Sequence, residues 1–136
     1  MRYAIYTDLA SDCEIIGNSF INAPPYIDYN SAYMIIIGNN LRQVTPTFRN
    51  PQLHIIEHNY GYLTENSGTA TIPSGQTSVT VNHGLVGTPT IVFIEVNHDE
   101  LKDYKIINKT STQFTVEVPN AVTADRTFSW RAWYEP

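Results

Sequence analysis

The sequence predicts an all-β protein, and three observations lead to that prediction. Short runs rich in Val, Ile, Thr and aromatic residues recur through its 136 residues, and several alternate between apolar and polar positions. No apolar period near 3.6 residues persists for more than two helical turns. Four of the eight prolines fall within 21–30 and 44–51, and such prolines exclude long helices from both stretches.

The C-terminal part, 67–136, shows the clearest strand pattern. Six short runs with turn signals between them fit a compact six-stranded antiparallel β-sandwich. The expected strands lie at 69–72, 77–82, 90–96, 104–108, 113–119 and 127–134.

Alternation within these runs predicts which side chains face the core. Phe114, Val116 and Val118 are expected to point inward. In the last run, Trp130 shares a face with Phe128, Ala132 and Tyr134, which leaves Arg131 and Trp133 on the opposite face. The run at 90–96 is apolar on both faces, which predicts a central strand covered on both sides.

The N-terminal part, 1–66, is less regular and predicts a smaller, loop-rich β region. Strands are expected within 2–7, 32–38 and 52–58, joined by long ordered loops. We expect no internal repeat in the chain. The sequence leaves open whether the region is a small β-domain or an arm that needs a neighbour to cover it.

Composition narrows the classes of partner. Only 15% of the residues are charged, the net charge is −5, and no Lys/Arg stripe supports nucleic-acid binding. The longest apolar run, 33–38, is too short to cross a bilayer. Early acidic residues argue against a secretory signal, so folding in a cytoplasm is expected. The single cysteine, Cys13, has no partner for an internal disulfide and is expected to be a small buried side chain.

No motif assembles a catalytic, cofactor-binding or metal-binding set. His54, Glu57 and His58 are not in the HExxH order. Strand positions four apart lie about 13 Å from each other, so these histidines are expected on a polar strand face. No Gly-rich phosphate loop, GxSxG elbow or carboxylate pair is found. A small hydrolase is therefore the third hypothesis, with His83 and His98 as the histidines to examine.

Two loops and one strand supply the candidate site residues. "NHGLVGTP" (82–89) is expected to be structural, with His83 and Gly84, Gly87 and Pro89 shaping the loop. "NHDE" (97–100) exposes His98, Asp99 and Glu100, which are candidate ligand or interface contacts. Arg131 and Trp133 share the outward face of the last strand, where an Arg beside a Trp is typical of sugar stacking or of an interface.

The run from "GTATIPSGQTSVTVNHGLVGTPTIVFIEV" through "INKTSTQFTVEVPNAVTADRTFSWRAWY" resembles the C-terminal β-sandwich modules of bacteriophage and archaeal-virus tail, fibre and capsid-associated proteins. These modules are similar to the H-type lectin fold. The resemblance implies a homotrimer located in the virion, contacts with other capsid or tail proteins and, in some members, binding of host surface glycans. By analogy, 1–66 would dock on the particle.

The leading hypothesis is therefore a non-enzymatic virion structural protein: a capsid decoration, head-fibre or tail-associated subunit. The alternative is a lectin-like, carbohydrate-binding module for host adhesion.

Overall fold

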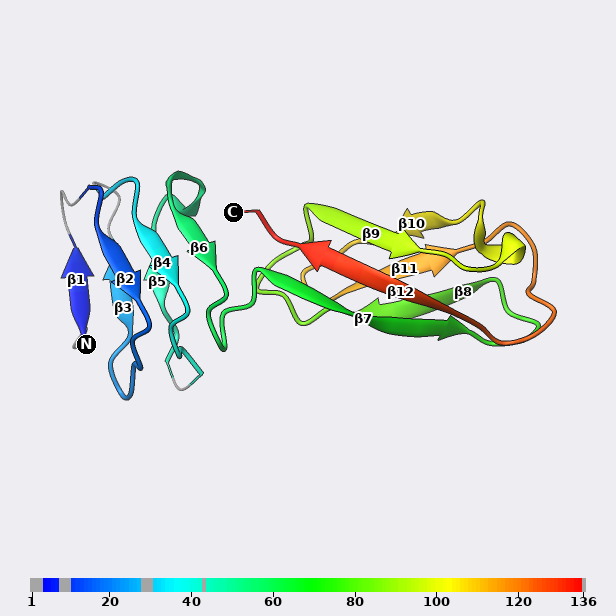
Figure 1. Cartoon of the computed structure of the whole chain (residues 1–136), viewed down its shortest axis with the longest axis horizontal. Coiled ribbons are helices and arrows are strands. Elements are labelled where there is room, and N and C mark those ends of the chain that lie inside the picture. Colours follow the sequence, from blue (N-terminus) through cyan, green and yellow to red (C-terminus); the bar gives the residue numbers. More distant parts are fainter. Residues whose placement is uncertain (1–3, 8–10, 28–30, 43, 136) are drawn as a thin grey trace. The chain divides into compact units, whose positions relative to one another are not determined.

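The protein is all-β and divides into two compact units, up to Thr64 and Glu65–Glu135 (Figure 1). The computed structural model describes residues 4–7, 11–27, 31–42 and 44–135. The helices among these residues are two short 3₁₀ turns, η1 (Pro51–Leu53) and η2 (Asp99–Leu101). In the described part of the chain, no helix has the length and apolar character needed to span a membrane.

The first unit is a smaller, loop-rich β region, as predicted, and its short strands form a parallel β-solenoid. Its strands alternate between two three-stranded parallel sheets, so that the chain winds from one sheet to the other and back. One sheet contains β1 (Ile5–Thr7), β3 (Pro25–Ile27) and β5 (Thr47–Phe48), and the other contains β2 (Glu14–Ile16), β4 (Ile35–Ile37) and β6 (Ile55–Glu57).

The solenoid contains an internal repeat, so the expectation of no repeat is wrong. The segments EIIGN (14–18), IIIGN (35–39) and IIEHN (55–59) occupy equivalent positions on successive coils. Their central isoleucines, Ile15, Ile36 and Ile56, are 5%, 0% and 3% exposed and stack inside the solenoid. Each coil thus places an isoleucine on the one below, and the coils bury a continuous core that no coil could bury alone.

A ladder of asparagines satisfies the polar backbone where the coils turn. The Asn39 amide donates to Ile15 O at 2.7 Å and to Asn59 Oδ1 at 2.9 Å, and its Oδ1 accepts from Asn18 N at 2.9 Å. Asn59 repeats the pattern by donating to Ile36 O at 2.7 Å. Because Asn39 and Asn59 are each 1% exposed, these bonds replace water that cannot reach the turn.

The environment of two side chains in this unit differs from expectation. Cys13 is exposed rather than buried, and its Sγ donates to Ser11 O at 3.3 Å. It lies just before β2, outside the stack of inward-facing side chains. His54 is 9% exposed rather than on a polar face, because its ring turns inward to bond Met34 N and Arg49 O.

The second unit consists of two antiparallel three-stranded sheets that share one core. The first has the order β7-β12-β9 and the second the order β10-β11-β8. The strands are β7 (Glu65–Ile72), β8 (Ser78–Asn82), β9 (Ile91–Glu95), β10 (Lys105–Ile107), β11 (Gln113–Glu117) and β12 (Arg126–Trp133).

The core of this sandwich-like unit matches the predicted alternation. Phe114 and Val116 of β11 are 0% and 1% exposed, and Phe128 and Trp130 of β12 are 2% and 7% exposed. Phe114 and Trp130 meet edge to face, with ring centroids 5.6 Å apart. The two sheets are therefore joined by aromatic packing between β11 and β12.

One strand of the sandwich lies in a different place from the prediction. β9 is an edge strand rather than a central, doubly covered one, because it pairs only with β12. Ile94 faces the core at 4% exposure, whereas Ile91 and Phe93 remain 46% and 59% exposed. The second apolar face of β9 is thus uncovered by the described residues of the chain.

Candidate functional site

His83 is buried inside the loop that joins β8 to β9. Its side chain is 0% exposed and lies parallel to the Phe114 ring, with centroids 6.4 Å apart. Nδ1 accepts from Leu85 N at 3.0 Å, and Nε2 donates to Thr110 O at 3.0 Å. Both ring nitrogens are therefore engaged with backbone groups.

The glycines of the same loop meet two different requirements. Gly84 has φ +69°, a conformation that side chains with a Cβ rarely adopt. Gly87 allows a close approach, because a Cβ built there would lie 2.5 Å from the Tyr134 ring. Pro89, at the exit, is buried. The loop thus packs closely against Tyr134, the residue that follows β12.

Glu100 holds two loops together at the far end of the sandwich. Its Oε2 pairs with Arg126 Nε, and its Oε1 accepts from Thr123 N at 3.0 Å. The hydrogen bonds from Arg126 and Thr123 lower the pKa of Glu100 from 4.5 to about 2. His98 Nδ1 accepts from Glu100 N at 3.2 Å and caps η2. Of the three candidates in the NHDE loop, His98 and Glu100 take part in these bonds, whereas the side chain of Asp99 does not and is exposed.

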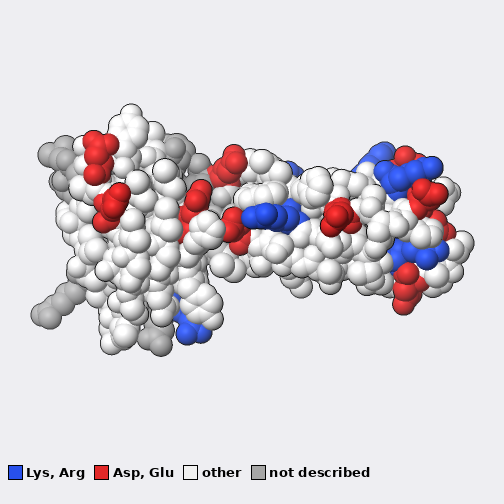
Figure 2. Space-filling model, in the orientation of Figure 1, with Lys and Arg blue, Asp and Glu red and all other residues white. Residues whose placement is uncertain are grey.

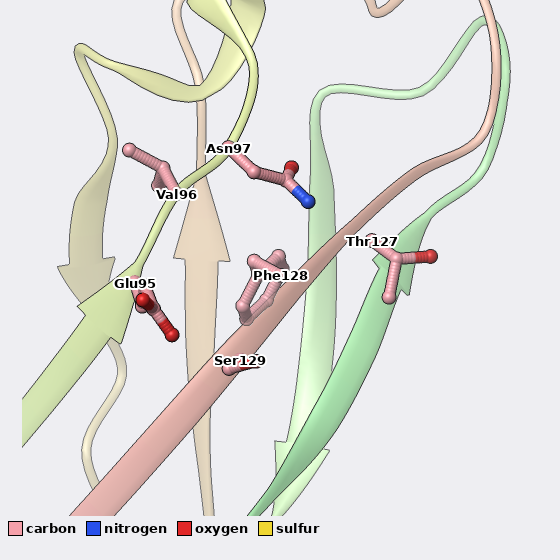
Figure 3. A pocket seen from close by; sticks show the side chains of 6 residues that line it. All are labelled: Glu95, Val96, Asn97, Thr127, Phe128 and Ser129. Carbon is pink, nitrogen blue, oxygen red and sulfur yellow. The ribbon is translucent and has the colours of Figure 1, made fainter.

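The NHDE loop borders two depressions. The first, of about 240 Å³, opens where β9 separates from β12 beyond the Ser129–Glu95 pair (Figure 3). Figure 3 shows the Thr127 side chain extending away from the other labelled groups. The second is shallow and is lined by Val96, Asn97, His98, Asp99 and Lys102. Among the described residues, no cluster of three or more His, Cys, Asp or Glu could hold a metal ion.

The outer face of the β7-β12-β9 sheet carries the most distinctive surface of the sandwich. Register places Ile91 beside Trp133 and Phe93 beside Arg131. The Arg131 guanidinium lies over the Trp133 ring, 4.9 Å from its centroid, and Glu65 Oε2 lies 3.8 Å from Arg131 Nη2. We call Ile91, Phe93, Arg131 and Trp133 the sandwich patch.

The structure does not bring all the candidate contacts together. Trp133 pairs with the first residue of β9, whereas His98 and Glu100 follow its last residue. The two groups therefore lie at opposite ends of the sandwich (Figure 1). Ile91 and Phe93 are not among the candidates, because the pattern of an apolar strand with two apolar faces predicts core residues. No sequence signal separates them from core residues, and it is the uncovered second face of this strand in the structure that identifies them.

Comparison with known proteins gives no family assignment. No protein-family model matches the chain, and no curated protein matches it.

Proposed function

We propose that the protein is a non-enzymatic structural subunit of a virion, of the capsid-decoration, head-fibre or tail-associated kind. The solenoid docks on the particle, and the sandwich joins copies of the chain into a trimer. The resemblance of 67–136 to virion β-sandwich modules supports the location, and the sandwich patch supports the association. The H-type-lectin-like architecture is part of the same proposal.

The observation that carries the proposal is the composition of the sandwich patch. Phe93 and Ile91 project from an edge strand beside a stacked Arg–Trp pair. Aromatic residues and arginine at the centre of an apolar patch are typical of the residues that dominate binding at protein interfaces. The strand IVFIE also contains no Lys or Pro, the residues that usually protect an exposed edge from pairing.

The chemistry of the loops supports a structural role. The two histidines to examine for a hydrolase, His83 and His98, each bond to groups of the sandwich itself, His98 through the Glu100 backbone N–H. Their contacts order loops rather than form a nucleophile with its base.

The association is tested with Phe93→Lys, which places a charge at the centre of the patch. Wild type is expected to have a solution mass three times that of the chain, and the variant the mass of one chain. Thr69→Lys is the matched control, because Thr69 is exposed on the same sheet face, paired with Ser129 on β12. A wild type that stays monomeric, or a Phe93 variant that stays trimeric, contradicts the proposal.

The location is tested separately on purified particles. The chain should band with particles of the virus that encodes it in a density gradient and be detected there by mass spectrometry. Its presence only in the soluble fraction of infected cells contradicts a virion role.

A second candidate function is carbohydrate binding by the same sheet face. The Arg131–Trp133 pair borders a cavity of about 260 Å³ lined by Arg131 with Glu65, Asn66 and Ser67. Aromatic rings beside charged and hydroxyl side chains suit a sugar, which offers both C–H faces and hydroxyls. A glycan array distinguishes the functions: a hit that disappears in Trp133→Ala supports a lectin, and a blank array leaves only the structural role.

A further inference from the structure

The sheet β7-β12-β9 splits near one end and leaves a notch between two of its strands. β12 pairs with β7 as far as Arg126, whereas its pairing with β9 ends where Ser129 lies beside Glu95. Among the described residues, 126–128 therefore have a strand partner on the β7 side only. The cavity of about 240 Å³ described above opens in this gap (Figure 3). We call it the strand notch. Its lining consists of Glu95, Val96, Asn97, Thr127, Phe128 and Ser129.

The backbone of Thr127 faces the strand notch. Trp133 O accepts from Thr90 N at 2.8 Å, which places this carbonyl on the β9 side of β12. The peptide groups of successive residues in a strand point alternately to its two neighbours, so those of Thr127 point to the β9 side as well. The Thr127 side chain bonds Thr71 instead. In the described part of the chain, no backbone hydrogen bond joins Thr127 to Asn97 across the gap. One donor and one acceptor of the backbone are thus open to a ligand.

This pair of groups is complementary to the N–H and C=O of another peptide residue, because antiparallel strands join through the same two bonds. The strand notch is smaller than the roughly 300–1,000 Å³ of sites for drug-sized ligands, so it suits one or two residues of an extended chain. Its other end is closed by β9, since Glu95, the last residue of β9, still pairs with β12. A chain that pairs with Thr127 must therefore place one of its termini at Glu95.

The charge at the closed end determines which terminus fits. Glu95 is exposed, and within the residues that the structure describes its carboxylate has no hydrogen bond or ion pair. A chain antiparallel to β12 runs in the direction of β9, which places its N-terminal ammonium group beside this carboxylate. A parallel chain would place a C-terminal carboxylate there, and the two like charges would repel each other. The closed end thus selects an N-terminal amine.

We propose that the strand notch binds the free N-terminus of an extended polypeptide. The ammonium group pairs with Glu95, and the second residue forms two backbone hydrogen bonds with Thr127. The first residue lies opposite Phe128, which points into the core at 2% exposure. Residues opposite each other on neighbouring strands share a face, so the first side chain also points inward and must be small. Figure 3 shows the Asn97 amide extending toward β12, where it can donate to a peptide carbonyl.

Recognition by the strand notch ends after about two residues. The chain leaves it toward the end of the sandwich that carries η2, where Figure 2 shows basic and acidic side chains gathered together. A surface of mixed charge sets no single charge preference for the rest of the ligand. The partner is therefore defined by a free amine and a small first side chain. This inference does not rest on the proposed trimer, because the strand notch belongs to one chain.

The test is an NMR titration of the isotope-labelled full chain with the tripeptide Ala-Ala-Ala. The amide resonances of Glu95, Asn97 and Thr127 should shift and reach saturation. N-acetyl-Ala-Ala-Ala lacks the ammonium group and adds bulk at the closed end, so it should bind at least fivefold more weakly. The absence of a saturable shift around the strand notch, or equal affinity for the acetylated peptide, overturns the inference.

A pair of variants tests the role of the carboxylate. Glu95→Gln keeps the size of the side chain and removes its charge, and it should weaken binding of Ala-Ala-Ala about two- to fivefold, the range of exposed ion pairs. Glu117→Gln is the matched control, because Glu117 is exposed on β11 in the other sheet; it should leave the affinity unchanged. Equal affinities of wild type and Glu95→Gln overturn the selection of an amine. Repeating the titration with Phe93→Lys separates this result from the fate of the proposed trimer.

Discussion

Replacing Asn39 with alanine should destabilise the solenoid far more than an ordinary polar-to-alanine change. The substitution removes the two bonds that the amide donates and the two that Oδ1 accepts from Asn18, at 2.9 and 3.3 Å. Ile15 O loses a buried donor, which costs about 1–3 kcal/mol, and each further lost bond costs about 1 kcal/mol. Asn59 Oδ1 keeps the bond from the backbone at residue 39. The expected loss is therefore about 4–6 kcal/mol.

The positions of the tryptophans give this experiment an internal reference. Both tryptophans, Trp130 and Trp133, lie in the sandwich. In urea titrations, tryptophan emission follows the sandwich, whereas far-UV circular dichroism follows both units. The unfolding of the solenoid is therefore seen by circular dichroism but not by tryptophan emission. Asn39→Ala should lower the urea midpoint of this solenoid transition and leave the midpoint of the emission change unaltered.

The neighbouring asparagine is the matched control. Asn40 is half-buried, and within the described part of the chain its side chain makes a single hydrogen bond, from Arg42 N at 3.3 Å. Asn40→Ala should cost less than about 1 kcal/mol. Equal losses for the two variants, or no loss for Asn39→Ala, would refute the argument that the ladder holds the coils together.

The remaining predictions concern the sandwich. His83→Ala removes a ring bonded at both nitrogens to backbone and should destabilise the unit by about 2–4 kcal/mol in tryptophan-monitored unfolding; a change under 1 kcal/mol contradicts its structural role. Gly87→Ala brings a Cβ against the Tyr134 ring and should cost about 1–3 kcal/mol in the same assay; wild-type stability would show that the ring moves freely. Because the pKa of Glu100 is lowered to about 2 by Arg126 and Thr123, its contribution is complete above about pH 4.5 and is lost as pH falls toward 2. Melting temperatures of wild type and Glu100→Gln should therefore converge on acidification, and a constant difference between them refutes the pairing.

Alternation made the sandwich predictable. Phe114 and Val116 point inward because each sheet of this unit has one buried face, which leaves a period-two pattern in the sequence. The same rule failed at β9. A strand with a second apolar face has the same sequence pattern whether that face is covered by its own chain or is exposed for contact with another molecule.

The solenoid escaped sequence reading for a different reason. Its strands are two or three residues long, too short for alternation to appear. The signal extends over 20–21 residues and survives only at the stacked isoleucine and the ladder asparagine. Glycine precedes that asparagine in two coils, and His58, at φ 52°, takes its place in the third. An asparagine in such a context is typical of a loop, and only the stacking of coils shows that it is buried.

Long-range pairings set the limit on site prediction. The sequence predicts Glu100 to be an exposed loop residue, and nothing local shows that Arg126, 26 residues later, pairs with it. Around His83, by contrast, the glycines and proline indicate a fixed turn locally, and the structure places this side chain buried in that loop.

The most direct test of the account is the mass of the intact wild-type chain in solution, measured by light scattering from nanomolar to micromolar concentrations. The account predicts a species of three chains at the upper end. A single chain at every concentration would contradict it, because the sandwich patch would then remain exposed to water without a partner.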